Sequence, residues 1–593
     1  MTNFIKPLIF TFFLLWVLTA NAGQSTWALY WVEPGESDTL IMAFDFPVDQ
    51  KKEFDKTIKR LQFSGSFIPE KGYVKFAAKV VSTGALCLGY FSLRCEMANT
   101  ELWNFDGPVL HKDIFRQSPH NPQNYFPDMA AQAVPMVALR KDNIFIAAVS
   151  DAPVHYDNFT TQEFLPQDGQ VCLNSGDNGV QPNQPAIKAV VKPDYHVITP
   201  YKGHHFQAII LSSEADDIAG LRQDVLLAIA RYWGGINDRY GAVAFASNYM
   251  HLRTDEVGYS DVIIVPGIEY SNYQYSRDAF WQSMILPPKY SAGCYQHLGM
   301  RQDLRAEIPL LFLLWSWMIT RQNNHIDMEI VQPYFDHLQQ HTKNGYFYSN
   351  VDPQRKNMQC WFDLCAFEED DVITYNQGLA ACAFMAAESL GLSCNTKSDL
   401  VIRRYREMYV DEKGYYPLSQ KKQVFTVDAL VGDLLAQLVF DKKLLPSDDV
   451  NSHYKTMMRI AKTPYGFKVI CDDDGSFLPA SFFDVPGYKA WLDRFEFGFY
   501  CYGGSYFLYD LLCLIDCYLH GVTEAEDQII WRTGIDFIAG GTYHEHMNTV
   551  TGKPGKANQG WNAAIYAIWQ RLIDQRKVDD RYFRAIDVML TND

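Results

Sequence analysis

The sequence has 593 residues, of which 69 are acidic and 52 are basic, so its formal net charge is −17. This balance argues against nucleic-acid binding, which needs clustered Lys and Arg to neutralise phosphates, and it disfavours polyanionic substrates. A chain of this length exceeds what one hydrophobic core usually serves, so we expect at least two domains.

Residues 1–22 are predicted to be a signal peptide. Lys6 precedes an apolar run over residues 8–18, and the small residues Ala20 and Ala22 fit the pattern of a cleavage site. The alternative is an uncleaved anchor, but the run is shorter than the roughly 20 apolar residues of a membrane span. We therefore expect an exported protein, periplasmic or secreted, with no membrane span after cleavage.

Residues 23–214 are predicted to form an antiparallel β-sandwich. Their apolar runs are short, alternating and rich in β-branched or aromatic residues, and clusters of Gly, Pro, Asn and Asp separate them. Many short strands with polar loops are typical of a sandwich. The clearest runs are WALYWV, KFAAKVV, IFIAAVS, AIKAVVK and FQAIILSS.

Residues 215–237 are predicted to be a linker helix, amphipathic and closed by Gly234 and Gly235. Beyond it, residues 238–593 show helical periodicity and little strand-like alternation, which indicates an all-α domain. Helices in such number often pair into an (α/α)6 toroid, although at this point the ring is a fold-level hypothesis. The expected helices cover 304–320, 328–341, 376–390, 399–408, 427–439, 506–520, 524–538 and 559–573.

The sequence contains twelve cysteines, which in an exported chain permit disulfides. The closest plausible local pairs are Cys87 with Cys95 and Cys360 with Cys365, whereas cysteines within apolar helical runs are expected to be buried thiols. There is no CxxC pair and no HExxH motif. We therefore expect no essential metal and no cofactor.

The segment SRDAFWQ at 276–282 is a candidate for binding a sugar. Arg277 and Asp278 offer a guanidinium fork and a carboxylate that can together hydrogen-bond vicinal hydroxyls, and Trp281 offers an apolar face. Asp278 is expected to be the ion-pair partner of Arg277. The alternative is a local salt bridge that caps a helix.

The segment after Gln359 is unusually acidic, with five carboxylates within nine residues. Asp363 lies among Trp361, Phe362 and Leu364, which would desolvate its carboxyl and raise its pKa, as a general acid requires. The acids at 368–371 are expected to face solvent. A calcium loop or a solvated acidic turn is the alternative.

Glu545 lies on a predicted loop before the last helix. An isolated Glu on a loop usually only contacts solvent, but polar and aromatic residues occur near Glu545 in the sequence, namely His544, His546, Asn548 and Trp561. These residues could order a water molecule beside its carboxylate and stack on a sugar ring.

In order and spacing, four segments resemble motifs of the six-hairpin glycosidases, especially the glycogen-debranching and processing α-glucosidase branch. They are SRDAFWQ, then WFD followed by TYNQGL, then YCYGGSY, and finally EHMNTVTG with QGW. Tyr502 stands where Asn is usual, and Met547 replaces Tyr. The resemblance covers roughly residues 238–573, and such enzymes often carry a β-sandwich ahead of the toroid.

The resemblance implies an exported glycoside hydrolase, inverting and exo-acting on α-glycosidic, α-glucoside-like bonds of oligosaccharides, without a cofactor. It assigns the general acid to Asp363 and the general base to Glu545.

Related toroids act on α-mannosides, α-rhamnosides or trehalose, and a catalytically inactive carbohydrate-binding protein is a further alternative. A polysaccharide lyase is disfavoured by the net acidity. The sugar, the linkage and the oligomeric state stay open. The residues expected to bind the sugar are Arg277, Asp278, Trp281, Trp361, Gln377 and Trp561.

Overall fold

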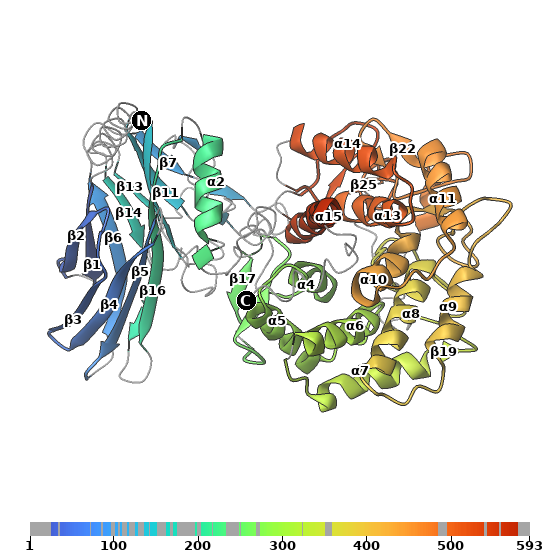
Figure 1. Cartoon of the computed structure of the whole chain (residues 1–593), viewed down its shortest axis with the longest axis horizontal. Coiled ribbons are helices and arrows are strands. Elements are labelled where there is room, and N and C mark those ends of the chain that lie inside the picture. The colour runs from blue at the N-terminus through green and yellow to red at the C-terminus, as the bar shows by residue number, and fades with distance from the viewer. Residues whose placement is uncertain are drawn as a thin grey trace, which may run out of the picture. The chain divides into compact units, whose positions relative to one another are not determined.

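The computed structural model describes residues 25–96, 136–150 and 203–232 with short gaps, brief strands within 101–127, 162–174 and 196–198, residue 248, and residues 251–578 except 256, 268–272, 323, 350–358, 484–494, 539–542 and 557–558. The chain divides into two compact units (Figure 1). The first comprises Met1–Thr254 with Ile268–Asn272, and the second comprises Asp255–Gly267 with Tyr273–Asp593. The predicted signal peptide and the run AIKAVVK lie outside the described residues.

Two antiparallel sheets make up most of the first unit. One has the order β13 (Gln162–Leu165), β14 (Gln170–Asn174), β6 (Cys87–Glu96), β1 (Ser25–Val32) and β2 (Thr39–Phe46), and β15 (His196–Ile198) also pairs with β6. The other has the order β3 (Lys52–Ile58), β4 (Leu61–Glu70), β5 (Tyr73–Ser82), β16 (His204–Ser213), β12 (Ile144–Ser150), β11 (Met136–Lys141), β7 (Glu101–Asn104) and β8 (Gly107–Pro108).

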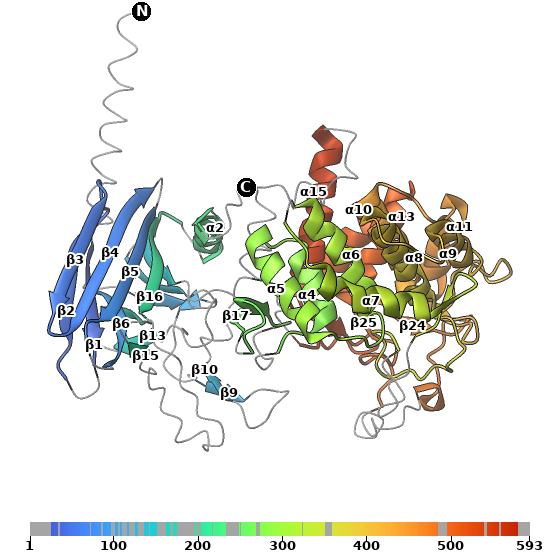
Figure 2. The same ribbon diagram turned by 90° about the horizontal axis from the view of Figure 1, so that it is seen from below.

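The two sheets face each other across one aromatic core (Figure 2). Trp31 of β1 meets Phe63 of β4 with ring centroids 5.7 Å apart, and Phe91 of β6 stacks on Phe206 of β16 at 6.1 Å. All four rings are buried. Because side chains alternate between the faces of a strand, the alternating apolar runs of the sequence lead to this sandwich arrangement.

The predicted linker helix packs on the sheet of its own unit. Helix α2 (Ile218–Ile229) contacts β16 and β12, and the carboxylate of Asp224 accepts a 2.7 Å hydrogen bond from Ser213 Oγ. The described helix lies inside the predicted 215–237, and the remaining residues of that range lie mostly outside the described part of the chain. By contacts, α2 belongs to the first unit, which extends to Thr254.

The second unit is largely helical. Helices occur where apolar periodicity predicted them, and they are α6 (Ile308–Arg321), α7 (Met328–Gln340), α8 (Thr374–Ser389), α9 (Ser398–Arg406), α10 (Val431–Phe440, after a turn at Val427–Leu430), α13 (Phe507–Leu519), α14 (Ala525–Ile538) and α15 (Gly560–Val578). Further helices of the described chain were not predicted, namely α4 (Ser276–Ser283), α5 (Pro288–Arg301) and α11 (Ser447–Thr456).

Six of these helices form a closed circuit of contacts. Helix α4 contacts α6, and the contacts continue through α8, α10, α13 and α15, which contacts α4 again. Helices α6, α8, α10 and α13 are buried on nearly all sides, whereas α7 and α9 bury one face, as expected for inner and outer positions. Figure 1 shows α5, α7, α9, α11 and α14 on the outside of this circuit. Within the described residues, no helix combines the length and apolarity that crossing a membrane requires.

The cysteines considered for local disulfides are thiols in the structure. Cys87 and Cys95 lie at opposite ends of β6, eight residues apart, which corresponds to roughly 26 Å along a strand. This separation excludes a bond between them. The Cys360 Sγ atom instead accepts a hydrogen bond from the backbone N–H of Phe362, and Cys365 is a separate buried thiol.

Candidate active site

The residues that the sequence analysis proposed for catalysis gather at the N-terminal ends of the helices in the closed circuit. The first turn of α4 carries Arg277 and Asp278, the loop before α8 carries Asp363, and the loop before α15 carries Glu545. The charges of Asp363 and Glu545 both act on Asp278, and the charge of Glu545 acts on Asp363. Three carboxyl groups from three distant segments therefore share one site.

Arg277 is held by a partner that the sequence did not predict. Its Nε donates a short hydrogen bond to the fully buried carboxylate of Glu307, which precedes α6. The expected pairing with Asp278 is wrong, because adjacent residues on a helix point in different directions. The guanidinium still interacts electrostatically with Asp363 and Asp278. Arg277 thus carries a fixed positive charge into the group of acids.

Asp278 has a strongly perturbed carboxyl group. Burial raises its pKa to about 7, and the negative charges of Glu545 and Asp363 add to the increase while Arg277 opposes it. At neutral pH, Asp278 is therefore a mixture of the protonated and ionised forms. The carboxyl can accept or donate a hydrogen bond to a ligand in the same site.

Asp363 has the raised pKa that its apolar neighbours suggested. Burial raises this pKa to about 6, Arg277 lowers it, and the charges of Glu307 and Glu545 raise it further. The hydroxyl of Tyr500 donates to its Oδ2 at 3.4 Å. The role of Asp363 as general acid stays a prediction, but its environment meets the electrostatic requirement.

The neighbouring acids are engaged elsewhere. Glu368 and Asp370 are exposed and both bind Lys421, the former at 2.6 Å. Asp371 is buried, and its carboxylate accepts hydrogen bonds from Ser419 Oγ at 2.6 Å and from the backbone of Lys421 at 3.0 Å. These contacts hold a surface turn in place, so Glu368, Asp370 and Asp371 stabilise the structure of the loop.

Glu545 is almost completely buried. Its backbone N–H donates to the carbonyl of Lys556 at 2.7 Å, and its Oε2 lies 3.5 Å from His546 Nδ1. That His544 and Asn548 help to order a water molecule beside Glu545 stays a prediction. The His544 ring contacts Asp536, at 2.9 Å, and His546 is the imidazole at Glu545.

Asn548 instead shapes the turn that follows Glu545. Its Nδ2 donates to Glu496 at 2.9 Å, and its Oδ1 accepts from the backbone N–H groups of Val550 and Thr551. An Asn side chain used in this way closes a turn.

The predicted sugar-binding tryptophans are buried. The Trp361 Nε1 donates to Asp428 at 2.5 Å, and its ring stacks on Tyr509 at 3.9 Å. Trp281 and Trp561 are 2% and 6% exposed. These rings support the walls around the acids and present little free face to solvent.

Gln377 lies outside the site. Its Nε2 donates to the carbonyls of Gly345 and Val401, and its Oε1 accepts from the backbone of Phe347. The side chain braces α8 against neighbouring segments, and both N–H donors of its amide are used by backbone carbonyls.

Sequence reasoning did not single out Tyr500, in the segment that precedes α13. Tyr500 has a positive φ of 47°, which is uncommon for a residue with a side chain, and its hydroxyl contacts Asp363. Cys501 lies near both acids: burial raises the pKa of its thiol, and the charges of Asp363 and Glu545 raise it further. The paired glycines in YCYGGSY marked this segment, but they did not single out Tyr500.

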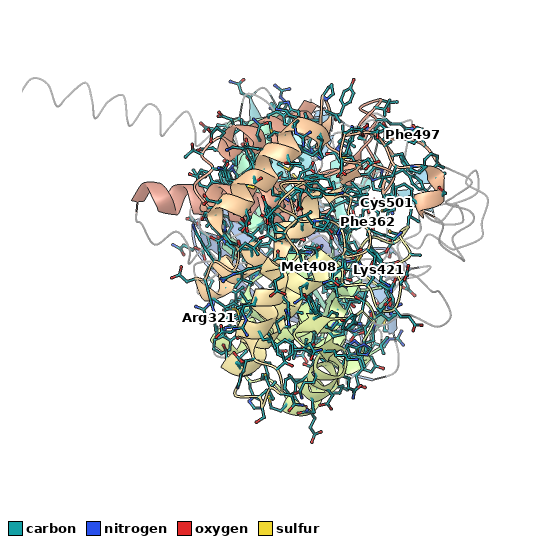
Figure 3. The ribbon with its side chains drawn as sticks, turned by 90° about the vertical axis from the view of Figure 1, so that its right-hand side faces the viewer. Arg321, Phe362, Met408, Lys421, Phe497 and Cys501 are labelled. Atoms are coloured by element: carbon teal, nitrogen blue, oxygen red, sulfur yellow. The ribbon has the colours of Figure 1, made fainter. Side chains whose placement is uncertain are left out.

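Tyr502, the residue that departs from the family motif, lies elsewhere. Its ring is buried and packs edge-on against Phe483 at 5.0 Å and tilted against Phe495 at 4.7 Å. Tyr502 therefore belongs to an aromatic cluster beside the site. Phe497 in the same cluster is 48% exposed and lies toward the edge of the unit in Figure 3.

In the described part of the chain, the acids of this site do not form a group of three or more side chains spaced for a shared metal ion. A grouping of that kind is formed elsewhere in the same unit by Asp433, Asp516 and His520.

No family model matches the sequence, and no curated protein matches it. The solved structures that match include the GH63 mannosylglycerate hydrolase from Thermus thermophilus in complex with glucose, with 12% identity over 52% of this chain and 96% of that chain and a TM-score of 0.38. An uncharacterised conserved protein from the same organism has 12% identity over the same shares and a TM-score of 0.37. A putative kojibiose phosphorylase from the human microbiome has 7% identity over 91% of this chain and 78% of that chain and a TM-score of 0.27. Similarity at this level carries no argument about activity.

Proposed function

We propose that this chain is an exported glycoside hydrolase whose helical unit is an (α/α)6 toroid and which releases terminal sugars from α-glycosides with inversion. The observation that carries the proposal is the buried group of Asp278, Asp363 and Glu545 with the positive charge of Arg277 beside it. Two acids with raised pKa values near a third carboxylate suit acid and base catalysis. The motif resemblance supports the same chemistry.

In this proposal, Asp363 protonates the departing glycosidic oxygen. A pKa near 6 keeps a working fraction of this carboxyl protonated in mildly acidic to neutral solution, whereas an ordinary Asp would be almost fully ionised. The Tyr500 hydroxyl fixes the orientation of the carboxyl through Oδ2. The proton is thus held by Oδ1, the oxygen on the other side of the carboxyl from the tyrosine.

Glu545 acts as the general base. Its carboxylate takes a proton from a water molecule that attacks the anomeric carbon from the face opposite the leaving group, so the product has inverted configuration. His546 lies against the same carboxylate and limits its motion. An inverting pair requires roughly 6.5 to 9.5 Å between the carboxyl groups to admit this water.

Arg277 and Asp278 bind the sugar. Glu307 fixes the guanidinium at Nε, so the remaining N–H groups can donate to sugar oxygens. Asp278 accepts a hydrogen bond from a sugar hydroxyl when ionised. Binding a neutral sugar among three acids favours protonation of one of them, which suits the high pKa of Asp278.

The test is a screen of the purified protein against a panel of aryl and disaccharide α-glycosides, with proton NMR of the first product formed. We expect hydrolysis of at least one α-glycoside and a product of inverted configuration. Retention would require a nucleophile about 5 Å from the acid and would exclude the mechanism. Binding of sugars without hydrolysis of any member, α-mannosides, α-rhamnosides and trehalose included, would leave a carbohydrate-binding protein.

A further inference from the structure

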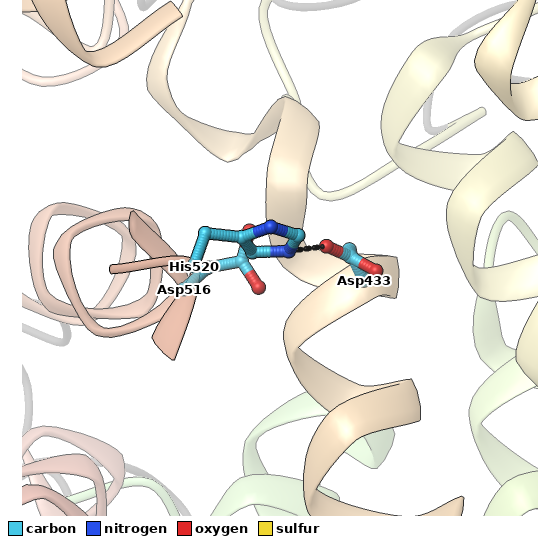
Figure 4. Close-up of side chains that lie close together, drawn as sticks. All are labelled: Asp433, Asp516 and His520. Atoms are coloured by element: carbon cyan, nitrogen blue, oxygen red, sulfur yellow. Dashed lines mark hydrogen bonds and ion pairs between the residues drawn. The ribbon is translucent and has the colours of Figure 1, made fainter. Parts of the chain in front are cut away.

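A second polar group lies in the helical unit, apart from the candidate active site. Asp433 is on α10, Asp516 is on α13, and His520 directly follows α13. Tyr509, which stacks on Trp361 in the candidate site, precedes Asp516 by two helical turns, roughly 10 Å. Figure 4 shows Asp516 and His520 side by side, facing Asp433 from the neighbouring helix. The two groups therefore lie apart along α13.

Each of the three side chains is oriented by a hydrogen bond at its outer atom. Metal-binding residues are typically held in this way by partners outside the ligand set. Asp433 Oδ1 accepts hydrogen bonds from the backbone N–H groups of Leu444 and, at 3.1 Å, Leu445. Asp516 Oδ1 accepts one from Gln437 Nε2 at 2.7 Å. His520 Nδ1 lies 2.9 Å from Ser447 Oγ.

The remaining atom of each residue is left for the others. His520 Nε2 lies 2.5 Å from Asp433 Oδ2, and one ligand atom from each of the three residues lies within 4.8 Å of the other two. Asp516 Oδ2 is fully buried and has no hydrogen-bond partner within the described part of the chain. Without a cation, the unit would bury an unsatisfied carboxylate oxygen opposite a second Asp, an arrangement that is costly.

We propose that Asp433, Asp516 and His520 bind one divalent transition-metal ion, of which Zn²⁺ is the representative, as a structural link between α10 and α13. The two carboxylates neutralise the charge of the ion, and an imidazole with two carboxylates suits Zn²⁺ better than Ca²⁺ or Mg²⁺, which prefer oxygen ligands alone. Asp516 and His520 are four residues apart, so they lie on one helix face. A buried water molecule or a second carboxylate oxygen completes four-coordination.

The site is structural because it is closed. The side chains of Asp433 and His520 are both 0% exposed, and Asp516 is 0% exposed as well. A catalytic metal keeps a position open to substrate, whereas a structural metal is enclosed by its ligands.

The experiment measures metal content and thermal unfolding of the full chain. Protein purified without chelator is expected to contain one Zn²⁺ per chain by elemental analysis. Dialysis against chelator should lower the melting temperature, and ZnCl₂ alone, but not CaCl₂, should restore it in a concentration-dependent manner. Wild-type protein that neither contains a transition metal nor gains stability from added ZnCl₂ would overturn the proposal.

Asp516→Asn is the decisive variant. It keeps the Oδ1 acceptor for Gln437 but removes the buried charge, so it should lose the Zn²⁺ and the response of the melting temperature to ZnCl₂. In chelator, the variant should be at least as stable as the wild type, because no buried carboxylate remains. Zn²⁺ retained at one per chain by Asp516→Asn would exclude these ligands.

Cys517→Ser is the matched control, since this buried thiol lies on the same helix outside the proposed ligand set. It should keep one Zn²⁺ per chain. If Asp516→Asn does not fold, Co²⁺-substituted wild-type protein decides the question. A strong thiolate-to-cobalt absorption band would place the metal on cysteines and overturn the proposal, whereas weak visible bands alone would support the Asp and His ligands.

Discussion

Tyr500→Phe should move the pH profile of activity without changing the fold. The Tyr500 hydroxyl donates to Asp363 Oδ2 and stabilises the ionised carboxylate, so it lowers the pKa of Asp363. Removing the hydroxyl should therefore raise that pKa above about 6. If Asp363 is the acid that must be protonated, the alkaline limb of the profile shifts to higher pH.

The size of the shift follows from the length of the contact. At 3.4 Å the bond is longer than an ordinary hydrogen bond between oxygens, so we expect it to be worth about 0.5 to 1 kcal/mol. One pKa unit corresponds to about 1.4 kcal/mol, so the expected shift is roughly 0.4 to 0.7 units.

The assay is kcat/KM against pH on a hydrolysed α-glycoside, for the wild type, Tyr500→Phe and a control. Tyr502→Phe is a suitable control because the Tyr502 ring packs against Phe483 and Phe495, in the aromatic cluster beside the site. The control profile should coincide with that of the wild type. An alkaline limb that stays in place or moves to lower pH in Tyr500→Phe would refute the assignment of Asp363 as the titrating acid.

Three further tests address the same site. Asp363→Asn and Glu545→Gln should each lower turnover by about 10² to 10⁴ with an unchanged circular dichroism spectrum, and near-wild-type activity of either variant on a poor leaving group would remove that residue from the mechanism. Arg277→Lys keeps the charge but loses the planar guanidinium that binds Glu307, so KM should rise and the melting temperature should fall. A lower melting temperature with an unchanged KM would show that Arg277 only stabilises the fold. Asp278→Asn should raise the melting temperature more at pH 8 than at pH 5, and the absence of this difference would contradict the raised pKa of Asp278.

The sign of the last effect follows from proton binding. The folded protein binds the Asp278 proton with a pKa of about 7, whereas an unfolded Asp has a pKa of about 3.9. The stability that this group contributes is therefore complete below about pH 4, and it is lost progressively as the pH rises from about 4 to about 7. An Asn has no proton to lose, so its advantage grows over this range and is largest above about pH 7.

Local patterns predicted much of the fold. Alternating runs indicated strands β1, β5, β12 and β16, and apolar periodicity indicated the buried helices of the second unit. Helices α4 and α5 were not predicted because their sequences contain few apolar residues. Helix α5 also begins with a Pro at its first position, which is equally compatible with a loop. Burial of Asp363 was predictable because Trp361 and Phe362 adjoin it in the chain.

The partners within the site were not predictable in the same way. Glu307 is separated from Arg277 by thirty residues, and the two meet only because α6 packs on α4. Tyr500 reaches Asp363 from a segment that lies 137 residues further along the chain. Gln377 shows the opposite error, since a polar residue in a motif-like segment binds backbone groups that the sequence does not place near it.

The contact between α15 and α4 also fixes an order of events during protein synthesis. A ribosome releases residues 276–283 long before residues 560–578. The faces of α4 and α13 that contact α15 therefore stay uncovered until α15 has been synthesised. Glu545 belongs to the same late segment as α15. The nascent chain therefore acquires Glu545 and closes the circuit of helix contacts in one final step, and truncation before α15 should leave exposed apolar surface that depends on chaperones.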